Sequence, residues 1–309
     1  MSIAFLFAGQ GTQHPGMGAD LYERYSAFRQ VFDQAQLDFD LKALCFEGPG
    51  ETLSQTRYTQ PCMVAFAAGV TAVLKEHGVV PDMAAGLSLG EYSALHAAGV
   101  LDAQMAIELV AFRGRAMEEA VQNRPCGMTA ILMLDRQTLQ SCCDKAKQDG
   151  VVEIANYNCP GQLVIGGDQK AVDTASRLAL AAGAKRAVAL NVSGPFHTSL
   201  MKPAGDRLRQ RFERVAFGPM TCPVYFNCLG APMGPGDGIA ALLERQVQSS
   251  VYLEDAIRAM IAAGADTFVE IGPGKALSGF VKKISKEVRL IAVETAQDVE
   301  SLVASLKGA

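Results

Sequence analysis

Residues 83–90 read Met83-Ala84-Ala85-Gly86-Leu87-Ser88-Leu89-Gly90, a short apolar segment that leads into a G-x-S-x-G motif, and a helical pattern continues to about Ala98. In this motif a strand turns sharply into a helix, and the glycines let the backbone pass closely. The serine hydroxyl is then exposed at the helix N-terminus, where the backbone N–H of Leu89 can donate to an oxyanion. We predict that Ser88 is a nucleophile. The alternative is a tight turn in which Ser88 only caps the helix.

A nucleophilic serine needs a general base, and the chain has four histidines. His197 follows an apolar run and precedes a helix, the kind of turn where α/β proteins collect functional groups. His77 ends a helix, and His96 lies about 12 Å along the helix from Ser88 at a rise of 1.5 Å per residue. We predict His197 as the base, against the alternative of a helix-terminal histidine bonded to backbone, and His14 stays open. Since no acidic partner stands at an obvious place, a dyad oriented by a backbone carbonyl is favoured.

Among the charged residues, Arg113 gives the most specific prediction about the substrate. The helix predicted from Asp102 to about Val121 gives it only apolar neighbours at i±3 and i±4, namely Leu109, Val110, Ala116 and Met117. An unpaired charge in an apolar stripe is costly, so an anionic partner is expected. A guanidinium binds a carboxylate through two hydrogen bonds. Arg113 therefore predicts a dicarboxylic acyl group, and the alternative is a salt bridge to an internal acid.

A glycine-rich loop follows the apolar run Ile3–Phe7, which predicts a buried strand. The loop reads Gly9-Gln10-Gly11-Thr12-Gln13-His14. The third glycine of a dinucleotide-binding fingerprint is replaced by His14, so we expect no nucleotide here. The loop is instead expected to bring the backbone N–H of Gln10 to the serine as a second oxyanion donor.

A long helix is predicted between this loop and the serine motif. Thr59-Gln60-Pro61 is expected to open it, because threonine is a good N-cap and proline is tolerated in the first helical turn. The helix is expected to end at His77-Gly78.

The pattern of elements changes after Pro125. Strands are predicted at residues 128–134, 151–158, 163–167 and 185–192, and helices capped by Asp135 and Asp168 at 135–148 and 168–182. This β-α-β-β-α-β order is that of a ferredoxin-like unit. We expect an α/β fold with a large α/β-hydrolase-like domain (1–124 and 197–309) and an inserted small ferredoxin-like domain (125–196). The active site is expected in the cleft between them.

Composition sets the broad class of the protein. The chain has 309 residues, of which 49% are hydrophobic and 19% charged, and its net charge is −4. These values are ordinary for a globular protein and do not favour nucleic-acid binding. No apolar run reaches the ~18 residues of a membrane span, and the N-terminus lacks the basic segment of a signal peptide. The eight cysteines form no CxxC pair, so we expect free thiols in the cytoplasm and no metal or cofactor.

Together these residues resemble the malonyl-CoA:acyl carrier protein transacylases of type II fatty-acid synthesis and the related acyltransferase domains of polyketide synthases. The matching stretches span nearly the whole chain and keep the family's order. They are Phe7-Ala8-Gly9-Gln10-Gly11-Thr12-Gln13, Gly86-Leu87-Ser88-Leu89-Gly90-Glu91-Tyr92-Ser93-Ala94-Leu95, Arg113-Gly114, Asn158-Cys159-Pro160-Gly161-Gln162, His197 with Leu200-Met201-Lys202-Pro203-Ala204, Arg245-Gln246-Val247, and Val269-Glu270-Ile271-Gly272-Pro273-Gly274.

The resemblance implies a ping-pong mechanism. His197 deprotonates Ser88, which attacks malonyl-CoA, and the N–H groups of Gln10 and Leu89 hold the oxyanion. A malonyl-serine ester forms while Arg113 holds the distal carboxylate. The phosphopantetheine thiol of an acidic acyl carrier protein then takes the malonyl group.

Three further residues take roles only through the resemblance. The backbone carbonyl of Gln246 orients the histidine, and Asn158 lies at the substrate cleft. Phe196 resembles the bulky residue of malonyl-selective acyltransferases and is expected to crowd an α-methyl group, at a cost of about 1–3 kcal/mol for methylmalonyl. Leu87 departs from the pattern, because many members have histidine before the nucleophile.

Two faces are candidates for docking the carrier protein, one with Arg207, Arg211 and Arg214 and the other with Lys282 and Lys286, against the alternative of simple solvated charge. Two other functions compete with transfer. A serine esterase or thioesterase shares the serine turn but needs no cation on a core-facing stripe. A non-catalytic binding module predicts that Ser88→Ala changes only stability.

Overall fold

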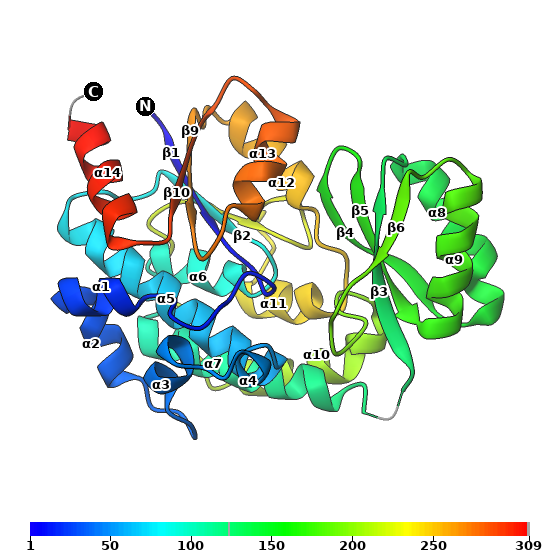
Figure 1. The fold of residues 1–309 in the computed structure, drawn as a ribbon, viewed down its shortest axis with the longest axis horizontal. Coiled ribbons are helices and arrows are strands. Elements are labelled where there is room, and N and C mark those ends of the chain that lie inside the picture. Colours follow the sequence, from blue (N-terminus) through cyan, green and yellow to red (C-terminus); the bar gives the residue numbers. More distant parts are fainter. Residues whose placement is uncertain (123, 308–309) are drawn as a thin grey trace. The chain divides into compact units, whose positions relative to one another are not determined.

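The computed structural model describes residues 1–122 and 124–307. The fold is α/β with two sheets, one of strand order β10-β9-β1-β2-β7-β8 and one of order β4-β5-β3-β6 (Figure 1). The chain divides into two compact units. The first comprises Met1–Gly114, Ala216–Tyr225 and Ala259–Ala309, and the second comprises Arg115–Val215 and Phe226–Arg258.

The first unit is built on parallel strands. They are β1 (Ile3–Phe7), β2 (Met83–Gly86), β7 (Val224–Phe226), β9 (Thr267–Ile271) and β10 (Arg289–Val293). Strands β1, β2 and β9 are almost entirely buried, which explains why they read as continuous apolar runs. The predicted strand at Ile3–Phe7 is confirmed with the same bounds.

Helices pack around these strands. Their bounds are α1 (Ala19–Arg24), α2 (Ser26–Gln34), α3 (Leu41–Phe46), α4 (Gly50–Leu53), α5 (Thr56–Glu76), α6 (Gly90–Ala97), α7 (Ala103–Glu119), α12 (Leu253–Ala262), α13 (Ala276–Ile284) and α14 (Ala296–Lys307). Helices α7 and α12 cross the boundaries of the units. Asp102 accepts a hydrogen bond from the N–H of Met105 and so begins α7 as predicted. None of the helices in the described part of the chain has the length and hydrophobicity that a membrane span requires.

Helix α5 begins earlier than the sequence indicated. Its first residue is Thr56, preceded by Gln55 in an extended conformation, so the predicted start at Thr59 is wrong. The Thr59 hydroxyl donates to the carbonyls of Leu53 and Gln55 and therefore stabilises the chain entry without capping the helix. Pro61 consequently lies in the second turn. The predicted end is confirmed, since His77 is the C-cap and Gly78 has a φ of 77°.

The second unit contains the antiparallel four-stranded sheet. Its elements follow the predicted order: β3 (Cys126–Leu132), α8 (Arg136–Ala146), η1 (Lys147–Asp149), β4 (Val152–Cys159), β5 (Gln162–Asp168), α9 (Gln169–Ala181) and β6 (Arg186–Ala189). Figure 1 shows α8 and α9 lying together on one face of this sheet. Ile131, Ile154, Leu163 and Leu139 form part of the core between them. The unit also holds η2 (Ser199–Met201), α10 (Lys202–Phe212), β8 (Ala231–Pro232) and α11 (Ile239–Val247).

The two predicted aspartate caps of this unit behave differently. Asp135 accepts from the N–H of Thr138 at 2.9 Å and caps α8 as expected. Asp168 occupies the N-cap position of α9, but its carboxylate does not cap the helix. It accepts instead from Arg124 and from the N–H of Val151. The cap prediction for Asp168 is wrong because a charged partner binds the carboxylate more strongly than a helix N–H does.

Candidate active site

Ser88 lies on the turn between β2 and α6 with a φ of 55°, an uncommon value for a residue with a side chain. The flanking glycines make the turn possible. A Cβ added at Gly86 would come within 2.0 Å of the Gly90 carbonyl group, and one at Gly90 would lie 2.3 Å from the Phe7 carbonyl oxygen. The backbone N–H of Leu87 donates to that same oxygen at 3.0 Å. The strained serine is thus held against the end of β1, as expected of a nucleophile on such a turn.

The glycine-rich loop lies next to this turn. A Cβ at Gly9 would approach the Leu87 carbonyl oxygen to 2.8 Å, so only glycine allows the loop so close. The side chain of Gln10 donates to the Thr56 hydroxyl at 3.1 Å, which ties the loop to the start of α5. Leu89 is the N-cap residue of α6, where helix N–H groups carry positive partial charge. Both predicted oxyanion donors therefore belong to segments that adjoin Ser88.

Arg113 is fully buried, as its position in an apolar stripe predicted. Its Nη1 donates to Gln60 Oε1 at 2.8 Å and its Nη2 donates to Ser88 Oγ at 3.1 Å. The guanidinium carbon lies 5.7 Å from the centroid of the Tyr92 ring. Burial lowers the pKa of Arg113, and the neighbouring Tyr92 and Glu91 counteract this effect. An arginine keeps its charge under such conditions, so a cation lies beside the Ser88 hydroxyl.

Gln60 is a site residue that the sequence analysis did not identify. It is 1% exposed and lies on α5, 53 positions before Arg113. A polar side chain directly before the mostly apolar run that starts at Pro61 was the available signal.

His197 belongs to the second unit, is 3% exposed and has a φ of 61°. Its Nδ1 lies 2.9 Å from the carbonyl oxygen of Gln246. Gln246 is in the last turn of α11, where carbonyls have no partner within the helix. A carbonyl only accepts hydrogen bonds, so Nδ1 carries the proton and Nε2 keeps its lone pair. The imidazole is therefore held in the tautomer that a general base requires.

Asn158 and Phe196, the two further predicted substrate residues, are also in the second unit. Asn158 lies on β4 and is 6% exposed, and its Oδ1 has no hydrogen-bond partner within the described residues. A buried amide oxygen without a partner is available to a ligand. Phe196 is buried, and a Cβ at Gly194 would lie 3.0 Å from its ring. Gly194 thus lets the chain fold closely over the ring.

The other three histidines have structural partners. His96 is buried and its Nδ1 lies 3.0 Å from the Leu101 carbonyl oxygen, and burial lowers the pKa of this imidazole. His77 ends α5, and the Nε2 of His14 lies 2.7 Å from a carboxylate oxygen of Glu294. His14, which the sequence left open as a base, is therefore bound to an acid near the protein surface.

The predicted docking faces are less regular than their spacing suggested. Helix α10 ends at Phe212, so Arg214 lies beyond it, and α13 ends at Ile284, so Lys286 lies beyond that helix. The expectation of a continuous helix face is wrong for both clusters. Arg207 also forms an ion pair with Glu119, so its attraction for an acidic carrier protein is weakened.

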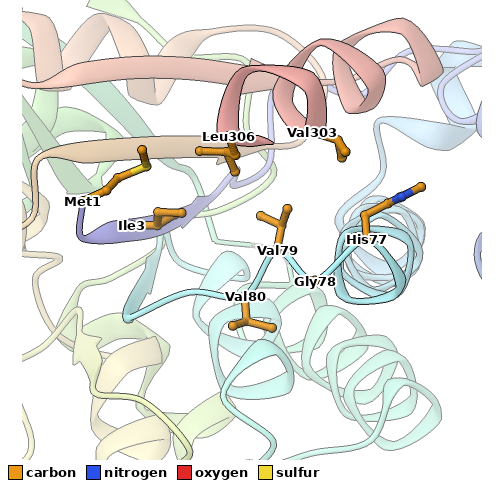
Figure 2. Close-up of a pocket in the computed structure, with 8 residues that line it drawn as sticks. All are labelled: Met1, Ile3, His77, Gly78, Val79, Val80, Val303 and Leu306. Carbon is orange, nitrogen blue, oxygen red and sulfur yellow. The ribbon is translucent and has the colours of Figure 1, made fainter. Parts of the chain in front are cut away.

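A pocket of about 270 Å³ lies in the first unit and is lined by none of the predicted site residues. Figure 2 shows Val79, Val303 and Leu306 pointing into it, beside Met1, Ile3 and His77. No cluster of three or more His, Cys, Asp or Glu suited to a metal ion occurs in residues 1–122 and 124–307.

Known proteins resemble the chain over nearly its full length. The family model for the acyl transferase domain matches residues 4–305. The malonyl CoA-acyl carrier protein transacylase of Bacillus subtilis is 44% identical over 308 residues, covering 99% of this chain and 97% of that protein. The enzyme of the same name from Escherichia coli K12 is 41% identical, covering 91% and 92%.

Two solved structures share the fold. The crystal structure of MCAT from Streptococcus pneumoniae has a TM-score of 0.94 and 46% identity, covering 98% of this chain and 100% of that one. A malonyl-transacylase in complex with a type II PKS acyl-carrier protein has a TM-score of 0.95 and 38% identity, covering 99% and 100%. With a family match over residues 4–305 and relatives above 40% identity, the chain belongs to the acyl transferase domain family.

Proposed function

We propose that the protein transfers a malonyl group from malonyl-CoA to the phosphopantetheine thiol of an acyl carrier protein, a step of fatty-acid biosynthesis. The observation that carries the proposal is the buried guanidinium of Arg113, 3.1 Å from Ser88 Oγ. A fixed cation beside a nucleophile favours an acyl group with a second carboxylate. Relatives named for this reaction, among them one solved with an acyl-carrier protein, support the same substrate and partner.

The first half of the reaction acylates the serine. Nε2 of His197 accepts the proton of Ser88 as Oγ bonds to the thioester carbon, and the N–H groups of Gln10 and Leu89 donate to the oxyanion. The carbon–sulfur bond then breaks, and His197 gives its proton to the sulfur of coenzyme A. Arg113 binds the free carboxylate of the resulting malonyl ester.

The second half reverses these steps with a different thiol. His197 takes the proton of the phosphopantetheine thiol, whose sulfur attacks the ester carbon. The bond to Ser88 Oγ breaks, and the proton returns to the serine. Asn158 of the second unit is proposed to bind substrate through its buried Oδ1, and Phe196 to exclude an α-methyl group.

The proposal includes the architecture expected from the sequence. A ferredoxin-like domain at 125–196 is supported by the chain order β3-α8-β4-β5-α9-β6 and the sheet order β4-β5-β3-β6. An α/β-hydrolase-like domain formed by 1–124 and 197–309 is supported by the parallel strands and the serine turn after β2. Residues 197–215 and 226–258 of this range belong to the second compact unit, so the proposed domain and the first unit differ in these segments. None of the eight cysteines, all within the described residues, forms a disulfide, and this supports a cytoplasmic location. Arg211 and Lys282 remain candidates for docking the acidic carrier protein.

Intact mass spectrometry with malonyl-CoA and no acceptor tests the proposal. Wild-type protein is expected to gain one malonyl group, and Ser88→Ala none. Free malonate without an adduct would identify a hydrolase instead. Neither adduct nor turnover would overturn covalent transfer.

A further inference from the structure

Gln60 has no role in the mechanism above, yet it directly contacts the residue that binds the substrate carboxylate. Its side chain is 1% exposed, and its Oε1 accepts a hydrogen bond from Arg113 Nη1 at 2.8 Å. A buried polar group on α5 would destabilise the helix packing unless it were bonded in this way. The contact therefore ties a helix in the N-terminal part of the chain to the guanidinium.

The two terminal nitrogens of Arg113 have different partners. Nη1 is bound to Gln60, and Nη2 is directed at Ser88 Oγ. Arginine has a long side chain with many rotamers, and fixing one end of its planar fork fixes the direction of the other. Gln60 thus pre-organises the guanidinium so that Nη2 stays at the reacting atom, where the acyl group will be attached.

The backbone around this contact is equally constrained. A Cβ at Gly114, next to Arg113, would come within 2.8 Å of both the Thr56 carbonyl oxygen and the Arg57 Cα. Helix α7 therefore touches the first turn of α5 at the arginine. The same turn holds the side chain of Gln10 through the Thr56 hydroxyl. Thr56 and Gln60 consequently hold the glycine-rich loop and the arginine, respectively.

The chemistry of the amide explains why glutamine suits this position. An amide oxygen satisfies one N–H of Arg113 without neutralising its charge, whereas a carboxylate would form an internal salt bridge and compete with a substrate carboxylate. We infer that Gln60 is a positioning residue that sets the preference for a carboxylated acyl group over an uncharged one. The inference rests on the proposed function, because it assumes that Ser88 is acylated by malonyl-CoA.

The test compares malonyl-CoA with acetyl-CoA as acyl donors. The rate of Ser88 adduct formation is followed by intact mass over a range of donor concentrations for wild type, Gln60→Glu and Gln60→Met. Thr59→Val is the matched control, since it removes hydrogen bonds one residue away on α5 that do not involve Arg113. The ratio of the two donors' specificity constants is the readout, because it does not depend on how much of a variant is folded.

Wild type and Thr59→Val are expected to share the same strong preference for malonyl-CoA. In Gln60→Met the malonyl specificity constant falls about tenfold, mainly through a higher KM, as expected for loss of a hydrogen bond to a charged group. In Gln60→Glu the malonyl specificity constant falls about a hundredfold, because the new carboxylate forms an ion pair with Arg113 and competes with the substrate carboxylate. In both variants the specificity constant for acetyl-CoA stays within about threefold of the wild-type value. The preference for malonyl-CoA over acetyl-CoA is therefore largely lost.

Two other results would overturn the inference, and they differ from each other. In the first result, wild type forms the malonyl adduct and both Gln60 variants either keep the wild-type preference or react more slowly with both donors by the same factor. Gln60 then has only a structural role. If wild type itself forms no adduct at Ser88, the proposed function fails, and the inference fails with it.

Discussion

Nδ1 of His197 lies 2.9 Å from the backbone carbonyl oxygen of Gln246, in the last turn of α11. In the proposed mechanism this contact takes the place of the carboxylate in a catalytic triad. The carbonyl selects the tautomer in which Nδ1 carries the proton and Nε2 can accept one. It also explains why the sequence shows no acidic residue at an obvious place for a triad.

Removing the imidazole should nearly abolish acylation. We expect His197→Ala to lower the rate of Ser88 malonylation by about 10²- to 10⁴-fold, the usual contribution of a general base. Rapid-quench intact mass measures this rate. His77→Gln is the control, because His77 ends helix α5 and has no part in the proposed mechanism, and it should keep the wild-type rate.

Gln246→Ala tests which atom orients the base. Because the bond comes from the backbone, the side chain can be removed without losing it, and the rate per folded molecule should stay within a few-fold of wild type. A loss from Gln246→Ala as large as that from His197→Ala would show that the side chain, and not the carbonyl, is required.

The glycines of the serine turn should be irreplaceable for steric reasons. In Gly90→Ala the new Cβ would stand 2.3 Å from the Phe7 carbonyl oxygen, so backbone has to move. We expect a loss of about 3 kcal/mol or more in the free energy of unfolding, at the upper end for overpacking. Thermal unfolding followed by circular dichroism should show a lower midpoint.

The same substitution at Gly279 provides the control. Gly279 lies in α13, is exposed, and has open space around its Cα. Alanine there should raise stability by about 0.5–1 kcal/mol through helix propensity. Equal midpoints for the two variants would mean that the close approach at Gly90 does not constrain the chain.

Local features of the site could be predicted from the sequence because their causes are local. The serine turn depends on two glycines within three positions of Ser88, and the burial of Arg113 follows from apolar neighbours within one helical turn. The caps at Asp102 and Asp135 depend on N–H groups three residues away, and they were confirmed.

Features that depend on distant partners could not be predicted in this way. The proposed role of Gln60 depends on its hydrogen bond with Arg113, 53 positions later in the chain. The residues around Gln60 in the sequence do not indicate that partner. Asp168 fails as a cap because Arg124, 44 positions earlier, binds its carboxylate. Both contacts arise only when the chain has folded, and in both a charged group outweighs the local preference.

The contact between His14 and Glu294 should make stability depend on pH. The hydrogen bond to Glu294 is the main cause that raises the pKa of His14 above its usual value near 6.5. A raised pKa means that the folded protein holds this proton more tightly than the unfolded chain. The stabilisation is therefore fully present below about pH 6.5 and is lost as the pH rises through the folded-state pKa.

Denaturant unfolding from pH 5 to 9 measures this effect. Wild type should be more stable than His14→Gln below pH 6.5, and the difference should vanish at high pH. Glu294→Gln should behave like His14→Gln, while its amide oxygen can still accept from the N–H of Gly274. A difference that stays constant across the range would show that the contact is not linked to protonation.

Phe196 should make the enzyme reject methylmalonyl-CoA. The ring is buried next to His197, and the close approach of Gly194 limits its freedom to move aside. One methyl group in a pocket changes transition-state binding by about 1–3 kcal/mol, so methylmalonyl-CoA should acylate Ser88 about 10- to 200-fold more slowly than malonyl-CoA.

Phe196→Ala should reduce this difference between the two acylation rates, because it leaves room for the methyl group. Phe39→Ala is the control, since the Phe39 ring packs edge-on against Tyr58, and it should leave the difference unchanged. Competition between the two donors, read as the ratio of the two adduct masses, measures the preference directly. Equal use of both donors by wild type would rule out a selective role for the ring.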